Sequence, residues 1–427
     1  MNVCGTIEVL NLCKKMMKLK ALIYVSTAFA NSHLNQSGEL YHPVKVDPYN
    51  LILTMKDQDE DTFNTVTYST VIGSHPNTYT FTKNLSEQVV KDQSVKFTIP
   101  SAIVRPSIII APSDKELEFY VDCVSQGSTS LIANYALGLN RVLPGKENNV
   151  MSVIPVDKVA NSILIAAWKV ATDHMDSKTG PVETSCGPAE TSCGPAKTSC
   201  GPAKTSCGQN GQAEISCGRN GQVSKSYDPE IYGLYSEKFY RYPLGELNKS
   251  VTAAAQKYPS MRTVRPPSQV ILTSRDGFRN KIYNFFFNTL FARLFDIFFM
   301  VTGQKIRLTK LMNKSIESFD TLRFFMSHDW INHGHKFLDV ISDLSEEERK
   351  IYCCEDEEMS REAQQDFLMN YWLGIRKWAL KETISNVNTA RVRLQKLSLI
   401  YNSFSTFLLS SIALLFATIV KHFLNYN

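Results

Sequence analysis

The chain has 427 residues, of which 43% are hydrophobic and 20% are charged, and its formal net charge is +5. The length accommodates two or three domains. The small charge, without a run of Lys and Arg residues, argues against a nucleic-acid partner. Five of the ten cysteines lie in one stretch of biased composition, and the others are scattered. Cysteines indicate a disulfide scaffold mainly in small secreted chains, so we expect a reducing compartment for this longer protein. We expect no signal peptide, because residues 1–20 contain no continuous apolar core.

Helices and strands alternate over the first 180 residues, which predicts an α/β fold with a parallel, doubly wound sheet. Residues 33–75 interrupt the alternation, and their polar, irregular sequence predicts a long surface excursion. The expected elements are a helix over 2–17, a buried strand over 21–25, a helix over 76–91, a buried strand over 101–111, and a segment over 148–155 that leads into a helix ending near Trp168.

Hydroxyl groups stand where the first predicted strand ends, and a Tyr-x-x-x-Lys pair stands on the next long helix. Ser26 and Thr27 follow the strand, and Tyr79 and Lys83 lie one helical turn apart. An ammonium one turn away favours the phenolate, so we expect Lys83 to lower the pKa of Tyr79 from about 10 toward neutrality. Tyr79 could then donate a proton while Ser26 or Thr27 polarises a carbonyl oxygen.

This layout is typical of hydride transfer from a nicotinamide cofactor, whose ribose Lys83 can also bind. The Tyr-x-x-x-Lys pair alone is a weak signal, since a chain with 18 tyrosines contains such a pair by chance. The position of the pair, after one strand end and before a second buried strand, makes the prediction of hydride transfer stronger.

The composition changes sharply after residue 180. Residues 184–203 repeat Thr-Ser-Cys-Gly-Pro-Ala-(Glu/Lys) with a period of seven, and ten-residue variants continue to Ser224. Glycine, proline and small polar residues bury too little apolar surface to offset chain entropy, so we predict disorder. We expect no metal site, because these cysteine spacings do not match zinc motifs and the stretch contains no histidine.

A helical domain is predicted over about 305–396. Ser345 and Glu348 form a capping-box pattern, and a neighbouring helix carries a face of large apolar residues. We interpret that face as core; its members are Phe367, Tyr371, Trp372, Ile375 and Trp378.

No charged residue lies from Leu397 to Val420. A helix of this length spans roughly 36 Å, which exceeds the ~30 Å hydrocarbon core of a bilayer. We therefore predict a transmembrane helix over 397–420, with a buried amphipathic helix as the alternative. Basic residues, among them Lys396, precede the span, so the positive-inside rule places the main body in the cytosol.

Several motifs in chain order resemble the landmarks of the fatty acyl-CoA reductases, which are extended short-chain dehydrogenase/reductases. The motifs of the first domain are Asn2-Val-x-Gly-Thr6, Val25-Ser-Thr-Ala-Phe29, Tyr79-Thr-Phe-Thr-Lys83, Val104-Arg-Pro-Ser107 and Ile154-Pro-Val-Asp157. Those of the helical domain are Ser318-Phe-Asp-Thr-Leu-Arg-Phe-Phe-Met-Ser-His-Asp-Trp330 and Tyr371-Trp-Leu-Gly-Ile-Arg-Lys377. The resemblance covers most of the chain outside 180–226.

The resemblance implies NADPH-dependent reduction of a long-chain fatty acyl-CoA to a primary alcohol through an aldehyde. It makes Tyr79 the acid and Lys83 the residue that tunes it and holds ribose. Ser26 or Thr27, with Thr27 favoured, would polarise the carbonyl. Arg105, Pro106 and Ser107 would line the nicotinamide side. A membrane anchor at the endoplasmic reticulum or the peroxisome fits the family, and the oligomeric state stays open.

One feature of the family is absent from this sequence: the Gly-x-x-Gly-x-x-Gly loop, whose backbone amides contact the cofactor pyrophosphate. We therefore expect an incomplete Rossmann-type sheet and weak or absent NADPH affinity. Two alternatives stay open: a non-catalytic, membrane-anchored interaction protein and a sterol- or sugar-modifying relative. The expected division is a partial NADP-binding Rossmann domain over 1–180, a disordered insertion over 181–226, a substrate-side linker over 227–304, a helical domain over 305–396 and the transmembrane helix over 397–420.

Overall fold

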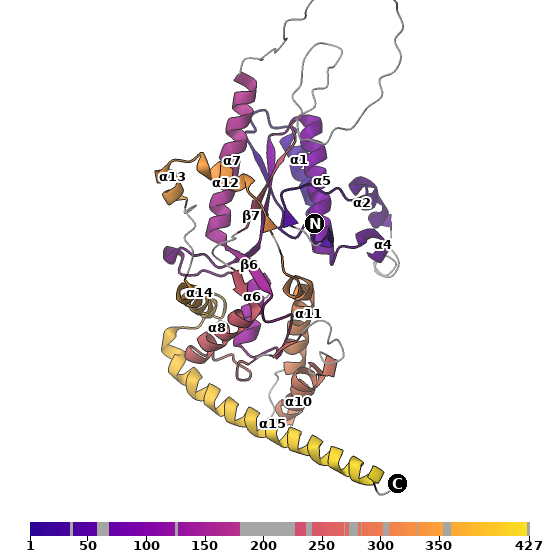
Figure 1. Ribbon diagram of the computed structural model, residues 1–427, viewed down its shortest axis with the longest axis vertical. Helices are drawn as coiled ribbons and strands as arrows, with labels where there is room; N and C mark the ends of the chain where they lie inside the picture. The colour runs from indigo at the N-terminus through magenta and orange to yellow at the C-terminus, as the bar shows by residue number, and fades with distance from the viewer. Residues whose placement is uncertain are drawn as a thin grey trace, which may run out of the picture.

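The computed structural model describes residues 1–34, 37–57, 68–123, 127–179, 227–235, 241–268, 270–272, 281–282, 284–301, 307–330, 332–352 and 360–424. Figure 1 shows two regions: a sheet flanked by helices at one end and a mainly helical region at the other. The cysteine-rich repeat over 184–224, with the disorder predicted for it, lies outside the described residues.

A three-stranded parallel sheet organises the first region. Its strands are β1 (Leu22–Val25), β3 (Ser101–Pro106) and β7 (Glu230–Leu234), in the order β1-β3-β7. All six residues of β3 are buried, as expected for a central strand covered on both faces. The predicted parallel sheet is confirmed. However, β7 belongs to the segment that the sequence assigned to a linker, so the chain returns to the sheet after the repeat.

Helices cover both faces of this sheet, and the alternation of side chains along β3 explains which helix packs where. Ile103 points toward α1 (Asn2–Cys13) and α5 (Thr78–Phe97), in a cluster with Leu10 and Leu85. Ala102 and Val104 point to the other face, toward α7 (Val156–Thr179) and α12 (Lys336–Ser342). Burial of each such aliphatic side chain contributes about 1.5–3 kcal/mol, so the two layers stabilise the sheet from both sides.

The predicted strand over 101–111 is divided at Ser107. Its second part, β4 (Ile108–Ile110), leaves the first sheet and pairs in parallel with β6 (Val150–Pro155), which pairs antiparallel with β8 (Arg241–Pro243). Two shorter ladders complete the described strands: β5 (Val142–Pro144) with β9 (Val270–Leu272), and β2 (Ser37–Gly38) with β10 (Asn332–His333).

The helical region packs against this second sheet through α6 (Gly127–Ala136), α8 (Leu244–Lys257) and α14 (Arg361–Gly374). The aromatic face of α14 is core, as predicted, because Tyr371, Trp372 and the following Ile375 are fully buried. The capping box at Ser345 is also confirmed, since its side chain accepts from Glu348 N while the Glu348 carboxylate accepts from Ser345 N.

Some elements differ from the prediction. The first helix ends at Cys13 rather than near residue 17, and the segment expected to be irregular contains η1 (Ser32–Leu34), α2 (Pro48–Asp57) and α4 (Tyr68–Ile72). The remaining helices are η3 (Lys115–Leu117), η4 (Phe285–Leu290), α10 (Phe291–Val301), α11 (Leu308–Ser327), α13 (Glu346–Ile351), η5 (Ile375–Ala379), η6 (Ile384–Asn386) and α15 (Val387–Leu424).

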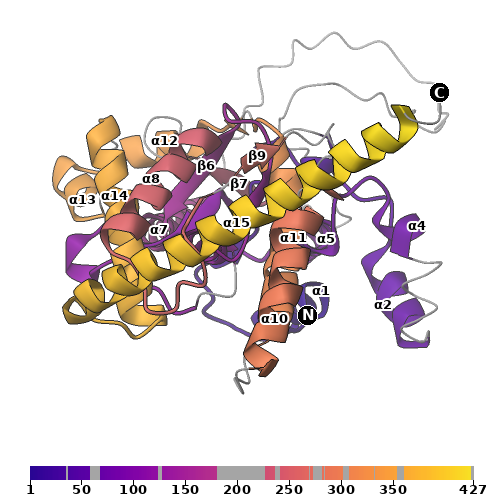
Figure 2. The ribbon, with the colours of Figure 1, turned by 90° about the horizontal axis from the view of Figure 1, so that it is seen from below.

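The long helix α15 contains the segment predicted to cross a membrane. It projects beyond the helical region, as Figures 1 and 2 show. Within the described part of the chain, no helix is long and apolar enough to cross a membrane. The prediction of a transmembrane helix over 397–420 is corrected accordingly. The described members of this segment include many uncharged polar side chains, such as Asn402, Ser403 and Thr406, which reduce its apolar character.

Candidate active site

The loop that follows β1 carries both candidate hydroxyl residues and is tied to β3. Ser26 N donates to Val104 O (2.8 Å), and Ala28 N donates to Pro106 O (2.9 Å). These bonds extend the pairing of the two strands beyond Val25. Ser26 and Thr27 are consequently almost fully buried at the carboxyl end of the sheet, with 3% and 5% of their surface exposed. Ligands of open parallel α/β sheets bind at this end.

Helix α5 places Tyr79 and Lys83 beside that loop. The helix begins with an N-cap in which the Asn77 side chain accepts a hydrogen bond from Thr80 N (3.0 Å). Lys83 Nζ reaches across to the strand and donates to Val25 O (2.8 Å). An ammonium has three donors, so two N–H groups remain after this bond. Lys83 therefore links the helix to the strand end and can still bind a ligand hydroxyl.

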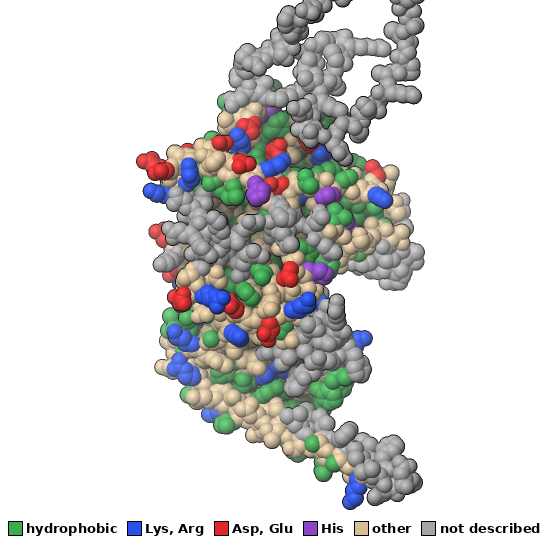
Figure 3. All heavy atoms as spheres, viewed as in Figure 1, with side chains coloured by type: hydrophobic (Ala, Val, Ile, Leu, Met, Phe, Trp, Pro, Cys, Tyr) green, Lys and Arg blue, Asp and Glu red, His purple; other side chains and the backbone are tan. Residues whose placement is uncertain are grey.

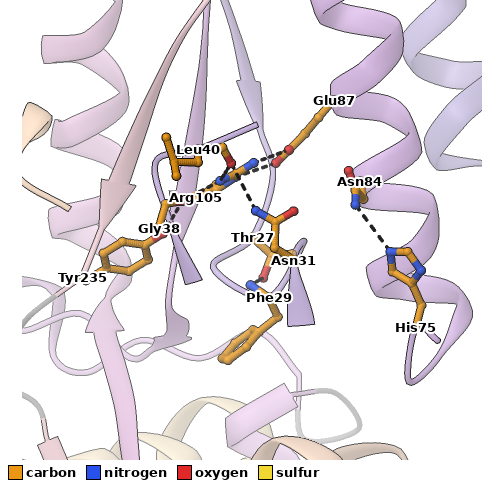
Figure 4. A network of polar contacts seen from close by, with 10 residues as sticks. All are labelled: Thr27, Phe29, Asn31, Gly38, Leu40, His75, Asn84, Glu87, Arg105 and Tyr235. Carbon is orange, nitrogen blue, oxygen red and sulfur yellow. Dashed lines mark hydrogen bonds and ion pairs between the residues drawn. The ribbon is translucent and has the colours of Figure 1, made fainter. Parts of the chain in front are cut away.

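Thr27 is the hydroxyl that influences Tyr79, because it lowers the pKa of that phenol. Its side chain also accepts a hydrogen bond from Phe29 N (3.3 Å), a contact that Figure 4 shows. Because the Thr27 oxygen accepts from the backbone, its proton is free to be donated toward Tyr79 or a substrate oxygen. The structure thus brings Thr27, Tyr79 and Lys83 together.

The pKa of Tyr79 shifts in the direction opposite to the one expected. Burial raises the pKa of the Tyr79 hydroxyl, and the hydrogen bond from Thr27 opposes this only in part. The Lys83 ammonium donates to the Val25 carbonyl. Burial also lowers the pKa of Lys83, while the nearby Glu87 carboxylate opposes that effect. A raised pKa keeps Tyr79 protonated at neutral pH.

Arg105, predicted to line the nicotinamide side, is engaged in a buried ion pair. Its guanidinium is 1% exposed and forms a two-point ion pair with Glu87 of α5, at 2.6 and 2.9 Å. The same group donates to Leu40 O (2.9 Å) and to Gly38 O. Figure 4 shows this network behind the Thr27 loop. Because these groups occupy the guanidinium, Arg105 fixes the 38–40 segment and α5 from inside the protein.

The other two predicted cofactor-side residues stay at the strand end. The carbonyl of Pro106 accepts from Ala28 N, and Ser107 is buried with only 4% exposed. The hydroxyl oxygens of Ser26 and Ser107 have no hydrogen-bond partner among the described residues. Buried hydroxyls normally have a partner, so two unpaired ones at adjacent strand ends fit a polar ligand placed there.

Sequence reasoning missed a histidine pair beside the site. The rings of His33 and His75 lie 4.0 Å apart, and Asn84 Nδ2 lies 3.4 Å from His75 Nε2. Burial, together with the neighbouring histidines His75 and His42, lowers the pKa of His33 to about 4. Three histidines within a polar excursion carry no spacing that would have identified the pair.

Charged side chains of both signs are interspersed over the described part of the face shown in Figure 3. Lys83 places a cation at the strand end through its bond to Val25 O.

Two family models described as male sterility protein match the chain, one over residues 1–163 and the other over 287–382. Fatty acyl-CoA reductase 2 of Mus musculus is 27% identical over 406 residues, which cover 95% of this chain and 67% of that protein. Fatty acyl-CoA reductase 1 of Xenopus laevis is 27% identical over 411 residues, which cover 96% and 68% respectively.

Among solved structures, the terminal R domain of a myxalamid PKS-NRPS pathway aligns with a TM-score of 0.41 and 12% identity, over 89% of this chain and 63% of that one. The similarity to known proteins rests on the sequence relatives rather than on this structural alignment. The two matched segments follow in the order expected from the motifs and lie in the sheet region and the helical region. The chain is thus similar to the fatty acyl-CoA reductases over most of its length, and two male sterility protein models match its two regions.

Proposed function

We propose that this chain carries the residues that reduce a long-chain fatty acyl-CoA to a primary fatty alcohol, with NADPH as the reductant. The observation that supports this most directly is the bond from Lys83 of α5 to Val25 O, which ties the helix that carries Tyr79 to the strand end where Thr27 is buried. The names of the curated relatives supply the substrate class.

In this proposal the carbonyl oxygen of the substrate lies between the hydroxyls of Thr27 and Tyr79. Thr27 donates a hydrogen bond as negative charge develops on that oxygen, and Tyr79 transfers its proton to it. The nicotinamide supplies the hydride that the carbonyl carbon accepts. The first reduction gives a hemithioacetal, which releases coenzyme A as a thiol and leaves an aldehyde. A second hydride and a second proton convert the aldehyde to the alcohol.

The residues that would hold the cofactor are those at the strand ends. Lys83 has two donors left for ribose hydroxyls, and the unpaired hydroxyls of Ser26 and Ser107 are available to the nicotinamide amide. Arg105 acts indirectly, by fixing α5 through Glu87. Because this sequence contains no Gly-x-x-Gly-x-x-Gly loop, we propose that NADPH binds weakly to this chain alone.

The test is acyl-CoA-dependent oxidation of NADPH, with the alcohol quantified by gas chromatography. It is run on this chain and on a fusion that places the amino-terminal segment of the mouse relative before Met1. Tyr79→Phe removes the proton donor while preserving the ring, so we expect alcohol formation by the fusion to fall about 10²–10⁴-fold. Thr82→Ala, on the same helix but outside the proposed constellation, is the matched control. Unchanged alcohol output from Tyr79→Phe would overturn the assignment.

A further inference from the structure

The strand-end loop carries an aromatic side chain that is inserted into the helical region. Phe29, two residues after Thr27, is 7% exposed. Its ring centroid lies 4.8 Å from that of Phe325 and 5.2 Å from that of Trp330, in tilted and edge-to-face arrangements. Both partners come from the carboxyl end of α11 and the turn after it. These distances and angles are those of favourable aromatic pairs.

The partners of Phe29 are themselves held in place. Trp330 Nε1 donates to Phe325 O (3.1 Å), and the Trp330 ring also contacts Phe324 at 5.7 Å. His328 donates from Nδ1 to Phe324 O (2.7 Å) and stacks on its ring at 4.4 Å. The end of α11 therefore forms a socket for the Phe29 ring that is also held by contacts of its own.

The backbone of Phe29 connects the socket at the end of α11 with Thr27 of the proposed reaction centre. The ring sits in the socket, and the N–H of the same residue donates to Thr27 Oγ1 (3.3 Å). Figure 4 shows the ring turned away from the Arg105–Glu87 pair while the backbone nitrogen faces Thr27. A movement of the ring would displace the Phe29 N–H. Thr27 Oγ1 would then no longer accept that hydrogen bond, which directs the Thr27 proton toward Tyr79.

We propose that Phe29 and Trp330 are positioning residues, through which the helical region holds the loop that polarises the substrate carbonyl. Phe29 lies in the first matched family segment, and Phe325 and Trp330 lie in the second, so the contact joins the two. The active site then depends on both regions, although the residues proposed to act on the substrate carbonyl belong to the first. The catalytic part of this inference rests on the proposed function; the structural part does not.

The structural part is tested by amide hydrogen exchange on the full chain. In Trp330→Leu we expect the amides of residues 26–34 to exchange on the order of five- to tenfold faster, because an aromatic anchor of the loop is lost. The amides of β3 should be unchanged. Trp168→Leu is the matched control, because Trp168 lies on α7 and is 44% exposed. Trp330→Phe keeps an aromatic ring and should retain most of the protection.

The result that overturns the proposal is equal exchange of residues 26–34 in Trp330→Leu and the parent chain, or a uniform acceleration that includes β3. If Trp330→Leu does not fold, Phe325→Leu, at a partly buried position, provides the same comparison. In the active fusion, we expect Phe29→Leu to lower kcat severalfold, to leave the KM for NADPH unchanged and to be rescued by Phe29→Tyr. The exchange measurement requires no activity, so failure of the proposed function and failure of this inference give different results.

Discussion

The ion pair between Arg105 and Glu87 should be a major determinant of stability. Its side chains are 1% and 0% exposed, and two short hydrogen bonds join them. Removal of one partner leaves the other charge buried without compensation, which costs about 3–5 kcal/mol. In Glu87→Leu we therefore expect the free energy of unfolding to fall by this amount.

Arg105→Met should cost at least as much, because it also removes the donor to the carbonyls of Gly38 and Leu40. Each buried acceptor left unsatisfied adds about 1–3 kcal/mol. The double variant Arg105→Met/Glu87→Leu should be clearly more stable than the sum of the single changes implies, since no charge is then left unpaired.

The measurement is urea unfolding followed by circular dichroism, with the free energies extrapolated to water. Lys91→Met with Asp228→Leu is the matched control cycle, because that pair lies at the surface, with side chains 31% and 58% exposed, and should contribute less than about 1 kcal/mol. A loss below about 1 kcal/mol in Glu87→Leu, or strict additivity in the cycle, would show that the buried pair does not act as described.

Three further predictions concern the site. Thr27→Val removes one hydrogen-bond donor to the developing oxyanion, so alcohol formation by the active fusion should fall about 10²–10³-fold. Thr27→Ser keeps the hydroxyl and should retain most of the activity. Equal loss in both variants would contradict this role of Thr27. Lys83→Met leaves the Val25 carbonyl without its donor and should lower the free energy of unfolding by about 1–3 kcal/mol, measured by urea titration; an unchanged midpoint would mean that the bond contributes nothing. The pKa of His33 is lowered from 6.5 to about 4, so its neutral form is favoured in the folded state, and stability should fall by roughly 1–3 kcal/mol as the pH drops from 6.5 to 4. His33→Gln should flatten that part of the pH profile, and a variant that keeps the full pH dependence would assign it to other groups.

The sequence identified the elements whose evidence is local. A continuous apolar run predicted β1, and a hydroxyl pair after it marked the strand end. The spacing of Tyr79 and Lys83 on one helix predicted that they lie together, and the capping box predicted the start of α13. In each case the pattern depends on residues a few positions apart, which secondary structure brings together directly.

What the sequence left open depends on contacts between distant segments. Only the folded chain shows that β7 returns to the sheet after the repeat, that Arg105 turns inward to Glu87, and that Lys83 bonds to the Val25 carbonyl. The direction of the Tyr79 pKa shift follows from partial burial of a side chain that is still 48% exposed, and tertiary packing sets that burial. The contact between Phe29 and Trp330 joins residues 301 positions apart, and no local periodicity encodes such a contact. Sequence pattern therefore identified the candidate groups for the chemistry, and tertiary packing decided their orientation, their burial and what holds them in place.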